Sequence, residues 1–222
     1  MLLATCVLSA MTLSGVAIAT TSPAKSGIVF GARASINSVP EQLFGNAQDH
    51  QSTAGITGST VYDNSSFGTT LSIGYDHAVS SHMTVGVKTG YGYIWSLSHG
   101  KAHTSTKSGD ISLDVMHIPL VVTGKYFFDS KFLLGAEAGA SLQKLNLTGS
   151  GIFNDADGRW KIAPKVSLMG GYQWDMGLSV TASAEYVFGK STDDFNPTNA
   201  NDVNQALAYY SFGLNVGYVL PL

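Results

Sequence analysis

Large apolar residues alternate with small or polar residues along the C-terminal segment of the chain. Phe212, Leu214, Val216, Tyr218, Leu220 and Leu222 occupy every second position, with Gly213, Asn215 and Gly217 between them. Successive side chains of a β-strand point to opposite faces of a sheet, so the pattern predicts a strand with one apolar and one polar face. If the apolar face meets lipid, the strand belongs to a membrane β-barrel.

The same alternation recurs in earlier segments, most of them near the length that a tilted strand needs to cross a membrane. These predicted strands lie at about 28–36, 67–76, 83–97, 111–128, 132–143, 165–174 and 178–188, and the last one runs from about residue 206. In the fourth segment the phase is disturbed near His117-Ile118-Pro119. Proline cannot donate to a strand ladder, so we expect a bulge there that swaps the two faces.

The connections between the predicted strands alternate sharply in length. The long ones are rich in Ser, Thr, Asn, Asp and Gly and lie at about 38–66, 98–110, 146–162 and 190–205. Long loops on one rim and short turns on the other are typical of outer-membrane barrels. A soluble barrel of the lipocalin kind would bury its apolar face, but here the opposite face carries charge and glycine. The prediction is all-β: a closed eight-stranded antiparallel up-and-down transmembrane β-barrel over residues 20–222.

Composition agrees with a membrane barrel. Charged residues make up 12% of the 222 positions, against about 25% in ordinary soluble proteins. The mean hydropathy of +0.12 is too low for a set of membrane helices. The formal charge of −3 and the lack of a Lys/Arg cluster argue against nucleic acid as a partner.

The N-terminal segment is predicted to be an export signal, residues 1–19. It is apolar and rich in small residues, and Ala17-x-Ala19 suits cleavage before Thr20. An N-terminal membrane helix is the alternative. The single cysteine, Cys6, lies inside the signal, so the mature chain has no disulfide and no Cys-based zinc site. Lipidation of Cys6 is disfavoured, because the apolar run continues past it.

Taken together, these patterns resemble the small eight-stranded outer-membrane barrels, namely the opacity-type surface proteins and the transmembrane domain of outer-membrane protein A. The likeness rests on the signal ending Ala17-Ile18-Ala19, the run Met116-His117-Ile118-Pro119-Leu120, the Gly-rich paired strands and the terminal Tyr218-x-Leu220-x-Leu222. It implies a place in the bacterial outer membrane, with lipid and the barrel-assembly machinery as partners. The family's last residue is usually an aromatic one that this machinery reads, whereas this chain ends in Pro221-Leu222.

Six charged residues fall on the small-residue face of their predicted strands and therefore point into the barrel: Arg33, Asp76, Lys88, Glu137, Lys165 and Glu185. Three cations and three anions imply a paired network, because an unpaired buried charge is costly. Eight-stranded barrels have interiors about filled by side chains. We therefore expect the network to fill the lumen and fix the register of the strands, with a small gated ion path as the alternative.

Aromatic residues gather near the ends of the predicted strands: Tyr75, Tyr93, Trp95, Trp174, Tyr186, Phe188 and Tyr218. Lipid-facing aromatics at both interfaces are typical of membrane barrels. We predict that these residues form the two girdles, and ligand stacking is the alternative.

Motifs for catalysis or for metal binding are weak. His99 and His103 share one loop without a third ligand nearby, and Asn154-Asp155-Ala156-Asp157-Gly158 lacks the distal Glu of a calcium loop. His117 and Asp114 lie on one strand, but serines are so abundant that a triad could be drawn almost anywhere. We expect no metal, no cofactor and no enzymatic activity.

The predicted function is that of a surface protein whose rigid barrel displays polar loops for adhesion, host contact or envelope integrity. A host or matrix ligand is then the expected partner at the loops. The alternatives are a narrow porin-like channel for small solutes and a lipid-modifying outer-membrane enzyme.

Overall fold

A computed structural model describes residues 23–39, 58–62, 65–103, 108–149, 156–189 and 204–222, so the predicted signal, residues 1–19, lies outside the described part. The strands are β1 (Gly27–Ser38), β2 (Gly58–Tyr62), β3 (Ser66–Ala78), β4 (Met83–His103), β5 (Ser108–Phe127), β6 (Phe132–Gly149), β7 (Ala156–Asp157), β8 (Lys161–Gln173), β9 (Leu178–Val187) and β10 (Tyr209–Pro221). No helix in these residues is long and apolar enough to span a membrane.

The strands form one antiparallel sheet that closes on itself. Each barrel strand pairs with its sequence neighbours, β4 pairs with β5, and β1 pairs with β10 from Gly27↔Pro221 to Ser38↔Tyr210. The short strands β2 and β7 add to β4 and β6 outside this ring, which leaves eight barrel strands. The predicted fold class is confirmed, as is the pairing of the C-terminal strand with the first.

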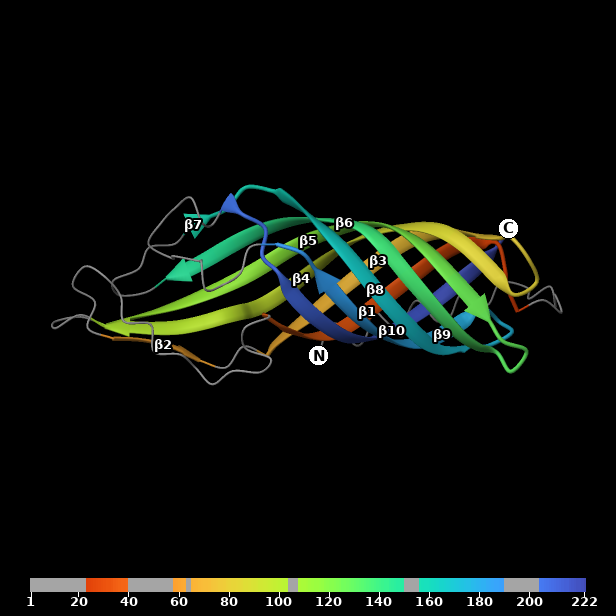
Figure 1. The fold of residues 1–222 in the computed structure, drawn as a ribbon, viewed down its shortest axis with the longest axis horizontal. Helices are drawn as coiled ribbons and strands as arrows, with labels where there is room; N and C mark the ends of the chain where they lie inside the picture. The colour runs from red at the N-terminus through yellow and green to blue at the C-terminus, as the bar shows by residue number, and fades with distance from the viewer. Residues whose placement is uncertain (1–22, 40–57, 63–64, 104–107, 150–155, 190–203) are drawn as a thin grey trace.

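Three strands continue far beyond the ring on the side of the long connections (Figure 1). β4 reaches His103, β5 begins at Ser108 and β6 ends at Gly149, so these strands enter segments expected as loops. β2 and β7 also lie within such segments. The strands were predicted from an apolar face that meets lipid. Strands that pair in water need no such face, so their extensions were not predicted.

The bulge expected at Pro119 is wrong. Pro119 pairs with Ser141 of β6, and the register of β5 with β4 is the same on both sides of it, at His117↔Gly92 and Leu120↔Thr89. The alternation of β5 is therefore unbroken. The inward face of β5 changes from apolar to polar along the strand. Near the loops it carries Leu113 and Val115, and nearer the turns it carries Thr123.

The true irregularity lies on the neighbouring strand. The pairing of β4 with β5 shifts between Ile94 and Ser98, and Ser96 has a left-handed backbone with φ of 50°. Leu97 continues the alternating series of Tyr93 and Trp95, which were predicted to face lipid, but this bulge turns it into the barrel, where it is fully buried.

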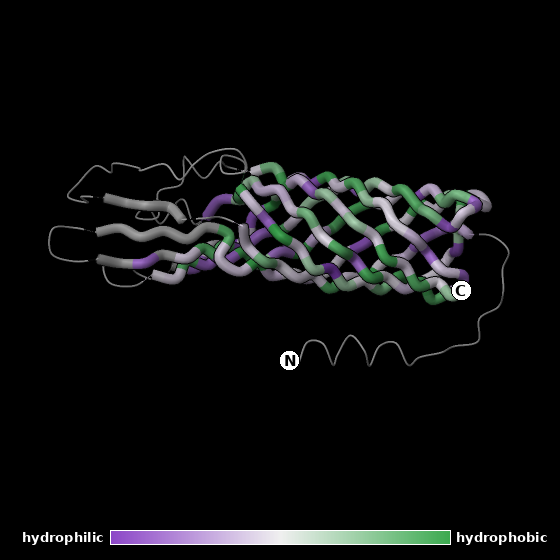
Figure 2. Tube along the Cα trace, turned by 90° about the horizontal axis from the view of Figure 1, so that it is seen from below, coloured by the Kyte–Doolittle hydropathy of each residue, from purple (hydrophilic) through white to green (hydrophobic). Residues whose placement is uncertain are grey.

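The wall of the barrel is apolar outside over its middle section. Hydrophobic and polar positions alternate along the strands, as Figure 2 shows by colour. Side chains such as Leu71, Leu120, Leu134, Leu168 and Leu214 are exposed by 58–69%. An exposed apolar belt of this kind on a closed barrel requires lipid around it.

Two apolar clusters, the two plugs, pack inside the barrel toward its two ends. The loop-end plug consists of Val39, Ile94, Leu97, Leu113, Val115, Leu145, Leu147, Ala163, Val187, Leu207 and Tyr209. The turn-end plug consists of Ala24, Phe127 and Leu133, with Ala78 and Met169 packed against it. The sequence patterns gave no indication of either plug.

Each plug includes a segment that folds in from outside the strands. At the loop end, the side-chain amide of Gln143 accepts from the N–H of Leu207 at 3.0 Å and donates to its carbonyl at 3.3 Å. At the turn end, Gln173 donates to the carbonyl of Pro23 at 3.0 Å, and the N–H of Ala24 donates to the carbonyl of Ser81 at 3.2 Å. Buried glutamines thus hold both plug segments by their backbones.

Replacing Leu145 by Ala tests the loop-end plug. Leu145 is fully buried, so Leu145→Ala is expected to lower the free energy of unfolding by about 2–5 kcal/mol through the cavity it leaves. The measurement is urea unfolding of the refolded protein in lipid vesicles. Leu134→Ala is the control, since Leu134 is 58% exposed on the outside and lipid tails fill the space its side chain leaves. Equal losses in the two variants would contradict a packed plug.

Candidate functional site

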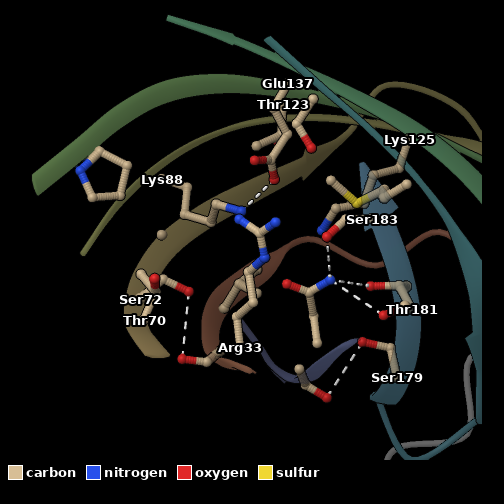
Figure 3. Close-up of a pocket in the computed structure, with 18 of the residues that line it drawn as sticks. Arg33, Thr70, Ser72, Lys88, Thr123, Lys125, Glu137, Ser179, Thr181 and Ser183 are labelled. Atoms are coloured by element: carbon tan, nitrogen blue, oxygen red, sulfur yellow. Dashed lines mark hydrogen bonds and ion pairs between the residues drawn. The ribbon is translucent and has the colours of Figure 1, made fainter. Parts of the chain in front are cut away.

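Charged side chains occupy the lumen between the two plugs. The six predicted residues all lie there, on the inward faces of separate strands: Arg33 on β1, Asp76 on β3, Lys88 on β4, Glu137 on β6, Lys165 on β8 and Glu185 on β9. Figure 3 shows Arg33, Lys88 and Glu137 reaching toward the middle of the lumen from different walls. Glycine makes room for long side chains, since a Cβ on Gly92 would collide with the ring of His117.

Glu185 is the centre of the largest ionic group. Its Oε2 atom lies 2.7 Å from Nη1 of Arg33 and 2.7 Å from Nζ of Lys165. Arg33 also donates through Nη2 to the hydroxyl of Ser211 at 2.9 Å. One carboxylate therefore joins β1, β8 and β9 across the barrel.

Two further ion pairs complete the network. Lys88 pairs with Oε1 of Glu137. Asp76 pairs with Nζ of Lys125 at 2.6 Å and accepts from the hydroxyl of Thr123 at 3.4 Å. Lys125 was missed in the sequence, because the expected bulge at Pro119 left the inward face of β5 unassigned. Unbroken alternation from His117 would have placed it in the lumen.

Buried polar groups beside the network lack partners. Nε2 of His117 lies 3.3 Å from the hydroxyl of Thr70, while Nδ1 of His117 and Nε of Arg33 have no hydrogen-bond partner among the described residues. The lumen between them leaves a cavity of about 90 Å³. On this measure one water molecule needs about 10–15 Å³, so the cavity has room for several.

His117 and Asp114 do not form a catalytic pair. Residues three apart on a strand point to opposite faces of the sheet. His117 points into the barrel, whereas Asp114 points outward. The carboxylate of Asp114 accepts hydrogen bonds from the hydroxyl of Tyr93 at 2.6 Å and from the N–H of Ser96 at 2.7 Å. In the described residues no group of three or more His, Cys, Asp or Glu could hold a metal ion. The side chains of His99 and His103 lie outside the described set.

The predicted aromatic residues lie at two levels of the wall. Near the loops, Phe67 stacks on Trp95 with ring centroids 5.7 Å apart, Tyr93 lies beside Trp95, and Tyr186 contacts Phe188. Near the turns lie Tyr75, Trp174 and Tyr218, and Trp174 contacts Tyr172 at 5.0 Å. Their spacing along the barrel supports our interpretation of them as interfacial girdles.

The turn-side rim carries an exposed ion pair of a different kind. Nζ of Lys131 lies 2.5 Å from Oδ2 of Asp175, and Lys25 donates to the carbonyl of Asp175. The hydrogen bond from Lys131 holds the pKa of Asp175 below its ordinary value. Water surrounds both partners, so the pair contributes little to stability.

Comparison with known proteins identifies the fold. No protein-family model and no curated protein sequence matches the chain. Neisserial surface protein A (NspA) is 14% identical over 88% of this chain and 98% of its own, with a TM-score of 0.53. Ail, the attachment invasion locus protein of Yersinia pestis, is 13% identical over 89% of this chain and 99% of its own (TM-score 0.45), and the outer membrane protease OmpT from Escherichia coli is 12% identical over 88% and 95% (TM-score 0.47). At such identities the likeness to NspA concerns the fold alone.

Removing the central carboxylate tests whether the network stabilises the barrel. Glu185→Gln leaves Arg33 and Lys165 buried without their anion, and we expect a loss of about 3–5 kcal/mol in the free energy of unfolding. The measurement is again urea unfolding in vesicles. Asp175→Asn breaks an exposed pair of the same chemistry and should change stability little. Similar losses in both variants would show that burial of the Glu185 group has no energetic consequence.

Proposed function

Because this chain has the fold of the small eight-stranded outer-membrane β-barrels, we propose that it is a bacterial outer-membrane surface protein. Its closed barrel is a rigid mount for the polar connections on one rim, which serve adhesion, host contact or envelope integrity. Loops carry function when a rigid scaffold holds them.

The packing of the lumen is the observation that carries this proposal. The loop-end plug and the turn-end plug lie above and below the ion pairs, and the cavity between them is about 90 Å³. The backbones of Pro23 and Leu207 are held at the two ends by hydrogen bonds with Gln173 and Gln143. This arrangement favours a structural barrel over a conduit.

The extended strands support display of the loops. β4 and β5 continue as a paired hairpin from His99↔Ser112 to His103↔Ser108, and β2 adds to its edge. β4, β5 and β6 therefore project beyond the rest of the barrel on one side (Figure 1).

A narrow channel and a lipid-modifying enzyme are the alternative functions. The charged lining of the lumen would favour a narrow channel if the plugs opened. A lipid-modifying enzyme is the third candidate, and an unchanged lipid A mass spectrum after deletion of the gene would remove it.

Planar-bilayer recording distinguishes a non-conducting barrel that displays loops from a channel. The purified protein is expected to give no steady single-channel current, because buried side chains pack at both ends of the lumen, while a general porin in the same bilayer conducts. A steady current from the wild-type protein that disappears in Lys88→Met or Glu137→Gln would overturn the proposal.

Shortening the connections tests the display role. Replacing residues 40–57 and 190–203 by short Gly-Ser linkers leaves every described barrel strand in place. Cells carrying this variant should lose adhesion to cultured host cells and matrix proteins while the barrel still shows its heat-dependent shift in gel mobility. Adhesion that survives when all four long connections are shortened would sink the proposal.

A further inference from the structure

The segment Pro23–Ser26 precedes β1 and belongs to no strand, yet it packs inside the turn-side end of the barrel. We call this segment the N-terminal strap. Within it, Ala24 is buried with Phe127 and Leu133 in the turn-end plug. The backbone of the strap is bound by residues that lie far away in the sequence, and these contacts show how it runs.

One peptide unit of the strap bridges two opposite walls. The carbonyl of Pro23 accepts a hydrogen bond from the side-chain amide of Gln173 at the end of β8, at 3.0 Å. The N–H of Ala24 donates to the carbonyl of Ser81, between β3 and β4, at 3.2 Å. The carbonyl and the N–H of a trans peptide point in opposite directions, and the β3–β4 and β8–β9 turns are half of the ring apart. The strap therefore crosses the turn-side end of the lumen.

The next two residues are also bound on both sides. The ammonium of Lys25 donates to the carbonyl of Asp175 in the β8–β9 turn, while the hydroxyl of Ser26 accepts from the N–H of Ala78 at the end of β3, at 2.8 Å. The N–H of Leu222 donates to the carbonyl of Ser26 at 3.4 Å. The strap is thus held by single hydrogen bonds and one buried methyl group, without a strand ladder.

This anchoring is weak compared with the packing at the other end of the lumen. The turn-end plug has three buried residues, whereas the loop-end plug has eleven. The strap can leave without breaking the pairing of any barrel strand, because β1 begins after it, at Gly27. Segments with few buried apolar contacts open locally at low free energy, while the rest of a fold stays intact.

The luminal cavity reaches the strap. Gln173 and Leu133, which hold the strap in place, both line this cavity. Asp76 and Lys125, which are ion-paired at 2.6 Å, line it as well. Water that enters from the turn side meets the strap before it meets this ion pair.

We propose that the N-terminal strap is a gate at the turn-side end of the lumen, and that its release admits water and small ions to the Asp76–Lys125 pair. The loop-end plug shares no residue with the turn-end plug and stays packed when the strap leaves. Release therefore opens the lumen from one end and gives no steady current through the barrel. The gate does not depend on the role of the loops.

Labelling of a single thiol tests the gate. Met169 lines the cavity and packs against the turn-end plug. Met169→Cys is combined with Cys6→Ser, which removes the one natural cysteine. The folded protein, purified from outer membranes into detergent micelles, is then treated with a small water-soluble thiol reagent. Ala24→Asp places a charge in the plug and releases the strap, so labelling should become at least about tenfold faster.

Ser130→Asp is the matched control for this experiment. It adds the same charge to an exposed position between β5 and β6, on the same rim. The labelling rate should stay as slow as in the protein without either substitution. Equal rates in Ala24→Asp and Ser130→Asp, or rapid labelling in the absence of both, would overturn the gate.

Trypsin digestion of the folded protein provides a second test, which does not need a charge in the plug. The peptide bond after Lys25 lies within the seated strap and should resist cleavage. Gln173→Leu removes the amide that binds the strap and leaves the sequence around Lys25 unchanged, so cleavage there should become at least about tenfold faster. Mass spectrometry of the digested chain measures the cut.

Gln143→Leu makes the same change at the loop end, where the amide binds the backbone of Leu207. The bond after Lys25 should stay protected in this variant. Equal acceleration in Gln143→Leu and Gln173→Leu would mean that general loosening of the barrel exposes the strap. Cleavage of the wild-type protein as fast as that of the unfolded chain would mean that the strap is not seated, and either result overturns the gate.

Discussion

Eight strands close into a barrel whose interior is about as wide as the side chains that fill it, so a charged group inside must find its partner on another wall. Glu185 on β9 meets Arg33 on β1 and Lys165 on β8. Because side chains alternate with period two, a slip of one residue would turn any of them into lipid and leave the others unpaired. The ionic contacts therefore specify the register on which the rest of the barrel depends.

The same constraint explains where glycine occurs in the wall. Long side chains in a narrow lumen need bare backbone opposite them, and Gly92 faces the ring of His117 while Gly213 faces the Arg33 side chain. A Cβ at either position would displace a member of the network. The charged residues and the glycines form one complementary set, which is why both share the inward face.

Period-two alternation was enough to predict eight strands, their closure and the inward direction of six charges. It could not predict which charges pair, since that depends on the stagger between strands. It also failed where the chemistry of the faces changes: Lys125 was missed because apolar residues on the inner face of β5 suggested a bulge at Pro119. The bulge on β4 follows from Ser96, whose left-handed backbone has no clear mark in sequence.

β6 shows why the inward face is polar in one part of the barrel and apolar in another. Over its first half Glu137 points inward between Ala136 and Ala138, whereas near the loops Leu145 and Leu147 point inward and Lys144 and Asn146 outward. The alternation is continuous, but its sense reverses where the outer wall passes from lipid to water. Beyond that level the barrel is built like a soluble one, with an apolar core and a polar surface. The loop-side end therefore has a core of its own, independent of lipid contacts, and this core is the base from which the extended strands rise.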